Sequence, residues 1–322
     1  MSAFRQSDRL SVSVPALSAL ALLIAALILL APSHVRGAFP GKPGLIAYDT
    51  SSQSGGGESE SDCVSESDAI KTMAPDGGDQ HRLGLGVDPA FSPDGRLIAY
   101  SICDGVQEDL MVMNSDGSDA HAVLATKKVS EDQPCFSADG KRLFFSRDSG
   151  GEGYSSIFSV ALDGSSLKRL TRAGKEVADH SPQAAANGRF VVFERNGRIL
   201  TMRPNGSDQK RLAIGYDPAI SPNSRSVAYA EGGQIFIVGS GGGRAHQLTH
   251  IKQGGELGGA PLSPAFSPDG RWVAFALERS IDYGPGFSDS QKLMKVSVAT
   301  GRLRDLTTTK VGGFHPDWQP LP

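Results

Sequence analysis

Two histidines in this 322-residue chain have a spacing that zinc hydrolases use. His246 and His250 are four positions apart, and on a helix this spacing places both imidazoles on one face, with a glutamate directly after the first histidine as general base. Gln247 stands where that glutamate is needed, and the segment reads as a strand that leads into a loop. The sequence therefore predicts no metal ligands here, and it indicates no cofactor.

Acidic residues gather in a second segment, where carboxylates could bind calcium. The segment lacks the ligand spacing and the central glycine of an EF-hand loop, so a solvated loop is the favoured interpretation. Nucleophilic catalysis has no support either, because the chain contains no Gly-x-Ser-x-Gly elbow. The acidic residues are Glu58, Glu60, Asp62, Glu66 and Asp68.

A third set of polar residues lies directly before, or one position further from, a proline that recurs along the chain. If these prolines mark equivalent strands of a closed ring, the preceding residues surround the mouth of its central channel. They then form a polar or metal-binding mouth, or they cap the strand entrances by bonding to the backbone, and both interpretations stay open. The binding residues predicted at the mouth are Asp88, Asp132, Gln133, His180, Asp217 and His315, and Ser181 and Ser263 complete the set.

The recurring proline belongs to a phrase that occurs six times. It reads Pro-Ala-Phe-Ser-Pro-Asp-Gly at 89–95 and 264–270 and Pro-Cys-Phe-Ser-Ala-Asp-Gly at 134–140, with weaker copies from Pro182, Pro218 and Pro316. The mean period of about 45 residues is typical of a four-stranded propeller blade. Short apolar runs broken by Gly and Pro argue against helical repeats of similar length.

Each repeat carries the turn residues of two hairpins. Ser-Pro-Asp-Gly supplies a preset φ at proline and a left-handed position at glycine, which suits a turn between the first and second strands. A second turn between strands three and four is marked by Asp-Gly, Asn-Gly, Gly-Gly or Thr-Gly. These pairs begin at Asp76, Asp116, Asp163, Asn205, Gly241 and Thr300.

The two ends of the repeated region complement each other. Residues 44–48 resemble a second strand without a first, and residues 316–318 resemble a first strand without a second. Joining them closes the ring and removes open sheet edges. The predicted fold is all-β: a six-bladed β-propeller of four-stranded antiparallel blades, whose closing blade is shared between the two termini.

The loops between second and third strands vary most in length, and they lie on one face of such a ring. Long ones are expected at 49–68, 101–108, 147–154 and 277–291, whereas 195–198 and 230–234 are minimal. Binding residues concentrate on variable loops of rigid scaffolds. This face is therefore the predicted binding face.

The first 37 residues read as a secretory signal. Arg5 and Arg9 precede an uncharged, leucine-rich run from Val14 to Ser33, and small residues permit cleavage before Ala38 or earlier. An uncleaved membrane anchor is the alternative. We expect a signal at 1–37, a propeller at 38–322 and an extracytoplasmic location, periplasmic or secreted.

The charge of the exported part argues against nucleic acid as a partner. The whole chain has a formal charge of −3, and residues 1–37 hold three arginines and one aspartate, which leaves −5 for the rest. Nucleic-acid binders normally present a basic face. No membrane contact is expected apart from the N-terminal segment, and the protein is expected to be a monomer.

At its repeat phrases the chain resembles the TolB-type propeller repeat, a WD-repeat-like unit. The resemblance runs from about Gly44 to Pro320 and implies the fold more than the function, because one fold hosts many activities. Two copies depart from the pattern, at Ala184–Gly188 and at Ser221–Ser224, so irregular turns are expected there. Similar propellers precede the hydrolase domain of prolyl-oligopeptidase-like peptidases, whose serine elbow is absent here.

The three cysteines have different predicted roles. Cys135 replaces an alanine of the repeat phrase, so it is expected to be a buried first-strand residue. Cys63 and Cys103 follow equivalent second strands and fall in loops on the same face. Because an exported setting is oxidising, the sequence predicts a Cys63–Cys103 disulfide, with a mobile Cys63 as the alternative.

The leading functional prediction is a non-enzymatic binding scaffold for a protein or a cell-envelope glycan. The alternative is an extracellular polysaccharide lyase or hydrolase with its site at the channel mouth. Geometry at the mouth distinguishes them: two carboxylates roughly 5–10 Å apart, or three converging His and Asp ligands, would favour the enzyme.

Overall fold

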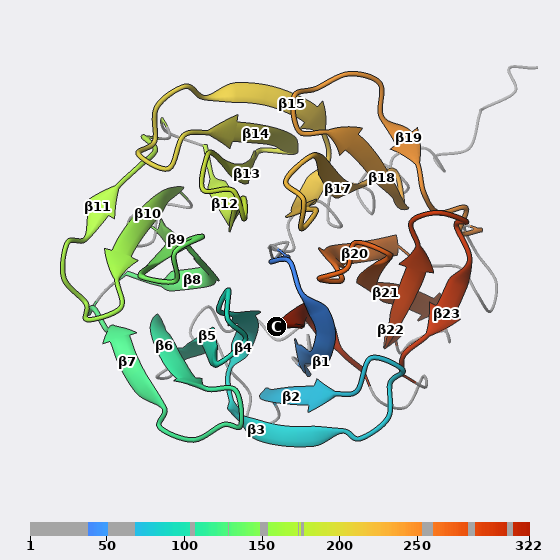
Figure 1. Ribbon diagram of the computed structural model, residues 1–322, viewed down its shortest axis with the longest axis horizontal. Coiled ribbons are helices and arrows are strands. Elements are labelled where there is room, and N and C mark those ends of the chain that lie inside the picture. Colours follow the sequence, from blue (N-terminus) through green and yellow to red (C-terminus); the bar gives the residue numbers. More distant parts are fainter. Residues whose placement is uncertain are drawn as a thin grey trace, which may run out of the picture. The chain divides into compact units, whose positions relative to one another are not determined.

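The computed structural model describes residues 38–50, 68–103, 107–127, 129–148, 154–172, 174, 177–252, 260–282, 287–307 and 312–322. All of them belong to the compact unit Ser33–Pro322. In these ranges 24 strands form six four-stranded antiparallel sheets, and no helix occurs (Figure 1). The sheets stand around a common axis, which confirms the predicted all-β six-bladed propeller.

Each blade runs from an innermost strand at the axis to an outermost strand at the rim (Figure 1). Blade 1 contains β4 (Val87–Phe91), β5 (Leu97–Cys103), β6 (Glu108–Asn114) and β7 (His121–Leu124). Blade 2 contains β8 (Glu131–Phe136), β9 (Arg142–Asp148), β10 (Ser155–Ala161) and β11 (Lys168–Arg169). Blade 3 contains β12 (Asp179–Ala184), β13 (Val191–Arg195), β14 (Arg198–Met202) and β15 (Lys210–Ile214).

The remaining blades follow the same order. Blade 4 contains β16 (Tyr216–Ile220), β17 (Ser226–Glu231), β18 (Gln234–Gly239) and β19 (His246–Gln247). Blade 5 contains β20 (Ala260–Phe266), β21 (Trp272–Asp282), β22 (Phe287–Ser297) and β23 (Leu303–Asp305). The closing blade contains β24 (Phe314–Leu321), β1 (Lys42–Asp49), β2 (Ala69–Met73) and β3 (His81–Leu85).

The closing blade joins the two ends of the chain as predicted. The C-terminal strand β24 pairs antiparallel with β1, with Ile46 opposite Trp318 and Ala47 opposite Asp317. Ile46 and Trp318 are fully buried and pack in one hydrophobic cluster with Ala265 and Ala274 of blade 5. The ring is therefore closed by sheet hydrogen bonds and by apolar packing against the neighbouring blade.

The Ser-Pro-Asp-Gly turns have a repeated hydrogen-bond pattern. Ser92 Oγ donates to Asp94 Oδ1 at 2.6 Å and accepts from the Leu97 N–H at 2.9 Å, while Gly95 takes a φ of 70°. The same serine-to-aspartate bond occurs at Ser137 and at Ser267. Within each of these turns, between the first two strands of a blade, the side chains thus form hydrogen bonds with the turn's own backbone groups.

The expectation of irregular turns in the two departing copies is wrong. Asn187 takes the role of the aspartate and accepts the Arg189 N–H at 2.9 Å. Ser224 takes the left-handed position of the missing glycine, with a φ of 58°. Both turns keep the repeat's backbone bonding, because Asn mimics the Asp acceptor and a single residue tolerates positive φ at modest cost.

The segment from Ala38 to Gly41 lies at the axis of the ring (Figure 1). The Ala38 N–H donates to the Ile220 carbonyl at 3.4 Å, and the Gly41 N–H donates to the Pro268 carbonyl at 3.3 Å. Phe39 is 6% exposed. Phe39 lines a small cavity together with residues of the innermost strands of four blades, namely Ala90, Phe91, Cys135, Phe136, Ala184 and Asp317. This segment fills the axis beside the Ser-Pro-Asp-Gly turns.

The hairpin between β21 and β22 is longer than its counterparts, and it corrects one predicted loop. The sequence predicts a loop at 277–291, but the two strands remain paired as far as Asp282 and Phe287. The predicted signal, residues 1–37, lies outside the described residues. Within the described ranges there is no helix of the length and hydropathy that crossing a membrane requires.

Candidate functional site

Each innermost strand carries a β-bulge at the residue before the recurring proline. The six residues have a φ between 46° and 58°, and the register of each strand pair shifts at this point. Proline fits after the bulge because it has no N–H to contribute to the ladder. All six are buried: Asp88, Gln133, Ser181, Asp217, Ser263 and His315.

Side chains of this ring bond to the backbone of the next blade. Gln133 Oε1 accepts the Ser181 N–H at 2.7 Å, and Asp217 Oδ2 accepts the Ser263 N–H at 2.9 Å. In the closing blade Asp49 Oδ2 accepts the Asp88 N–H at 2.9 Å. These bonds are the backbone-capping role that the sequence left open, and they link neighbouring blades around the axis.

Three side chains of the ring's closing region converge on one point. His315 Nδ1 lies 2.6 Å from Asp49 Oδ2 and 3.2 Å from Asp88 Oδ1. One potential ligand atom from each of the three residues lies within 4.8 Å of the others. Asp49 ends β1, Asp88 belongs to β4 and His315 belongs to β24, so the cluster spans the junction of the closing blade and blade 1.

Further carboxyl groups stand near this cluster. Burial and the neighbouring carboxylates of Asp88 and Asp148 raise the pKa of Glu108 to about 8. Burial and the charges of Glu108 and Asp88 hold the pKa of Asp132 well above its ordinary value. The axial mouth between the closing blade and blades 1 and 2 is therefore crowded with acidic groups that repel one another.

The mouth lies at the end of the ring that bears the variable loops. In blade 1, Val87 pairs with Ser101 and Ala90 pairs with Ala99, so Asp88 stands level with the C-terminal part of β5. Glu108 opens β6, directly after the predicted loop 101–108. Phe39 packs against residues two to three positions further along the same inner strands, on the opposite side of the ring of bulges.

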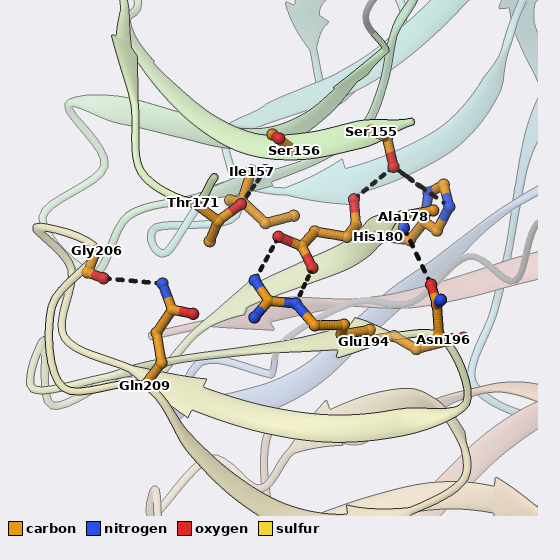
Figure 2. A network of polar contacts seen from close by, with 12 residues as sticks. Ser155, Ser156, Ile157, Thr171, Ala178, His180, Glu194, Asn196, Gly206 and Gln209 are labelled. Carbon is orange, nitrogen blue, oxygen red and sulfur yellow. Dashed lines mark hydrogen bonds and ion pairs between the residues drawn. The ribbon is translucent and has the colours of Figure 1, made fainter. Parts of the chain in front are cut away.

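His180 has a different environment. Its ring contacts Ser155 Oγ at 3.2 Å, and Ser155 Oγ also donates to the Asp179 carbonyl at 2.8 Å (Figure 2). Burial lowers the pKa of His180, which favours the neutral imidazole. Beside it the Asp179 carboxylate, fully buried, binds Arg195 through two hydrogen bonds of 2.5 and 2.7 Å.

Asp217 belongs to a second acidic pair on the ring. Its N–H donates to Glu194 Oε2 at 3.4 Å. Burial, followed by the charge of Asp217, raises the pKa of Glu194 to about 8. The predicted mouth residues therefore do not form one site: Asp88, Asp132 and His315 share one acidic region, whereas Gln133, His180 and Asp217 have separate partners.

Sequence reasoning missed four acidic residues of these regions, namely Asp49, Glu108, Asp148 and Glu194. None belongs to the repeat phrase, and the one available signal was their position at the ends of strands that border loops. Of the acidic segment, residues 58–66 lie outside the described residues, and Asp68 is buried. His246 and His250 are exposed and lie on a strand and the loop after it, as predicted.

Two cysteines lie within the described residues. Cys135 is buried in β8, as expected for an alanine position of the repeat. Cys103 ends β5, and Cys63 lies outside the described residues, so the Cys63–Cys103 disulfide stays a prediction.

Comparisons with known proteins agree with the fold. Dipeptidyl-peptidase 5 of Porphyromonas gingivalis is 24% identical over 291 residues, covering 68% of this chain and 41% of that protein, so the chain spans less than half of this relative. The structure of TolB from Acinetobacter baumannii superposes with a TM-score of 0.67 at 19% identity, covering 86% of this chain and 67% of that one. A chain of the nidogen/laminin complex has a TM-score of 0.63 at 11% identity, with coverages of 86% and 98%.

At these identities the two solved structures support the fold alone. The family model described as TolB beta propeller domain matches residues 80–254, which is more than half of the chain. This chain belongs to the TolB beta propeller domain family.

Proposed function

We propose that this protein is an exported, non-enzymatic binding scaffold whose loop-bearing face receives a protein partner through basic side chains. The observation that carries the proposal is the acidic region at the axial mouth. There burial and the neighbouring carboxylates of Asp88 and Asp148 raise the pKa of Glu108 to about 8, and burial and the charges of Glu108 and Asp88 raise the pKa of Asp132. A Lys or Arg side chain placed among them would relieve this repulsion.

The choice of a protein over a neutral cell-envelope glycan follows from charge. A neutral sugar forms hydrogen bonds but leaves the repulsion between the carboxyl groups in place. A guanidinium or ammonium group compensates it, and a partly buried setting strengthens that attraction relative to bulk water. The axial segment around Phe39 supports approach from the loop-bearing face, because it occupies the axis on the other side of the bulges.

The test is partner capture by the full chain from an extract of the producing cell's envelope. The variant combines Glu108→Gln with Asp132→Asn and removes two acidic groups from the mouth. Its control combines Asp116→Asn with Asp163→Asn, which removes two acidic groups from exposed Asp-Gly turns between third and fourth strands. We expect the mouth variant to lose at least nine tenths of the captured partner and the control to keep it. Equal capture by both would contradict the proposal.

The second candidate is the extracellular polysaccharide lyase or hydrolase, and two observations favour it. Asp49, Asp88 and His315 are three converging His and Asp groups, and the half-buried residues Glu108 and Asp132 have carboxyl groups with raised pKa values. Such carboxyls are the groups that general acid catalysis uses. Release of reducing ends or unsaturated sugar ends from an envelope polysaccharide, abolished by Glu108→Gln, would favour the enzyme over the scaffold.

A further inference from the structure

We propose that Asp49, Asp88 and His315 bind one divalent transition-metal cation at the junction between the closing blade and blade 1. The donor set decides the class of ion. Two carboxylates and one imidazole suit Zn²⁺ or Mn²⁺, whereas Ca²⁺ and Mg²⁺ prefer sets made of oxygen alone. The site therefore differs from the calcium loop considered for the acidic segment around Asp68.

The distances fit such an ion. A tetrahedral zinc ion at 2.0–2.2 Å from each ligand separates two donor atoms by about 3.4 Å. His315 Nδ1 and Asp88 Oδ1 are 3.2 Å apart, which is close to this value. His315 Nδ1 and Asp49 Oδ2 are 2.6 Å apart. A side-chain movement of less than about 1 Å would bring these two atoms to the separation that the ion requires.

The three ligand residues are buried in the folded protein. Asp49 and Asp88 are 0% and 1% exposed, and His315 is 7% exposed. A divalent ion bound here would be shielded from bulk water, and its positive charge would attract the two carboxylates strongly.

A neighbouring oxygen also points to a ligand. Asp132 Oδ1 is buried and has no hydrogen-bond partner among the described residues. Its carboxyl group interacts with the charge of Asp88, so it lies close to the same cluster. Buried carboxylate oxygens normally have a hydrogen-bond partner or a metal ion as a partner. A metal ion in the cluster, or a water molecule bound to that ion, would supply the partner for Asp132 Oδ1.

The backbone holds the ligands in place before any ion binds. Asp88 and His315 both occupy pre-proline bulges, with φ values of 58° and 46°. Asp49 Oδ2 accepts the Asp88 N–H at 2.9 Å, which fixes one ligand against the backbone of another. Hydrogen bonds of this kind orient the ligand side chains and raise the affinity for a metal ion, because the side chains lose little conformational freedom when the ion binds.

The test is titration calorimetry of the EDTA-treated full chain with ZnCl₂ and with MnCl₂. All proteins carry His246→Ala and His250→Ala, because that exposed pair offers zinc an adventitious surface site. The cluster variants are Asp88→Asn and His315→Asn, since asparagine tolerates positive φ. The matched control is Ser263→Asn, at the equivalent bulge of blade 5.

We expect one equivalent of metal, a melting temperature that rises with metal concentration, and at least tenfold weaker binding in both cluster variants but not in the control. The absence of binding in the background protein, or binding by the cluster variants that is as tight as in the background protein, would overturn the proposal. If a cluster variant fails to fold, crystals of the full chain grown with ZnCl₂ decide the question. An anomalous peak between Asp88 and His315 supports the site, and peaks found elsewhere alone contradict it.

Discussion

His315 Nδ1 lies 2.6 Å from Asp49 Oδ2, although 266 positions separate the two residues in the sequence. The contact joins the innermost strand of the closing blade, β24, to the end of its neighbour, β1. The acidic cluster at the axis therefore exists only when the ring is closed, and ring closure and the candidate site depend on the same strand.

Removal of residues 315–322 should open the ring. The truncation deletes the buried Trp318 and the Asp317 carboxylate that accepts the Phe91 N–H at 2.7 Å. Loss of the tryptophan alone is worth about 3–5 kcal/mol in a well-packed core. Thermal unfolding followed by circular dichroism measures the effect against a control that lacks only the exposed residues 321–322. A truncated protein that melts with the control would show that closure is built differently.

The buried ion pair of blade 3 should contribute strongly to stability. Arg195→Met leaves the fully buried Asp179 carboxylate without its guanidinium, and breaking a buried pair in this way costs about 3 kcal/mol or more. Arg203→Met removes the exposed pair with Asp208 and should cost less than about 1 kcal/mol. Urea unfolding of both variants compares the two. An equal loss of unfolding free energy in Arg195→Met and Arg203→Met would mean that burial does not determine how much an ion pair contributes to stability.

Glu194 should make stability fall as the pH rises. Its pKa is about 8 in the folded protein, whereas the ordinary value for a glutamate is 4.5, so between these values the folded state holds a proton that the unfolded state has released. The contribution is fully present below pH 4.5 and is lost as the pH rises through 8. Relative to Glu194→Gln, the wild type should lose up to about 1.4 kcal/mol per pH unit in between. Unfolding curves that stay parallel for the two proteins from pH 5 to pH 9 would refute the assignment.

The Cys63–Cys103 disulfide should leave one thiol in the protein. Thiol counting on the denatured, unreduced chain gives one if Cys63 and Cys103 are paired, with Cys135 as the remaining group. The bridge closes a loop of about 40 residues, worth roughly 4 kcal/mol in the chain-entropy model and less if the folded state is strained. Three reactive thiols would exclude the pairing.

The fold could be predicted from the sequence because its determinants are local and repeated. Ser-Pro-Asp-Gly turns, alternating apolar strands and complementary ends each appear within a few residues of one another. Local rules also explain the two turns that were wrongly expected to be irregular. Asn187 and Ser224 perform the roles of the absent Asp and Gly. A sequence motif that specifies Asp and Gly does not recognise such replacements.

The acidic cluster could be predicted only in part, because it depends on contacts between blades. Asp88 and His315 were found because they precede the repeated proline. Asp49 was missed because it lies 39 positions before Asp88 and outside the phrase. The raised pKa of Glu108 likewise comes from burial and from carboxylates on other strands, which spacing along the chain does not reveal.

The most direct test of the scaffold proposal places a photo-crosslinking amino acid at one exposed position on each face. Lys127 lies after β7 in the connection to blade 2, on the loop-bearing face, and Ser118 lies in a turn between third and fourth strands on the other face. Irradiation in an envelope extract should join a partner protein to position 127 and leave position 118 unmodified. Crosslinks to position 118 alone, or to both positions equally, would contradict binding at the mouth face.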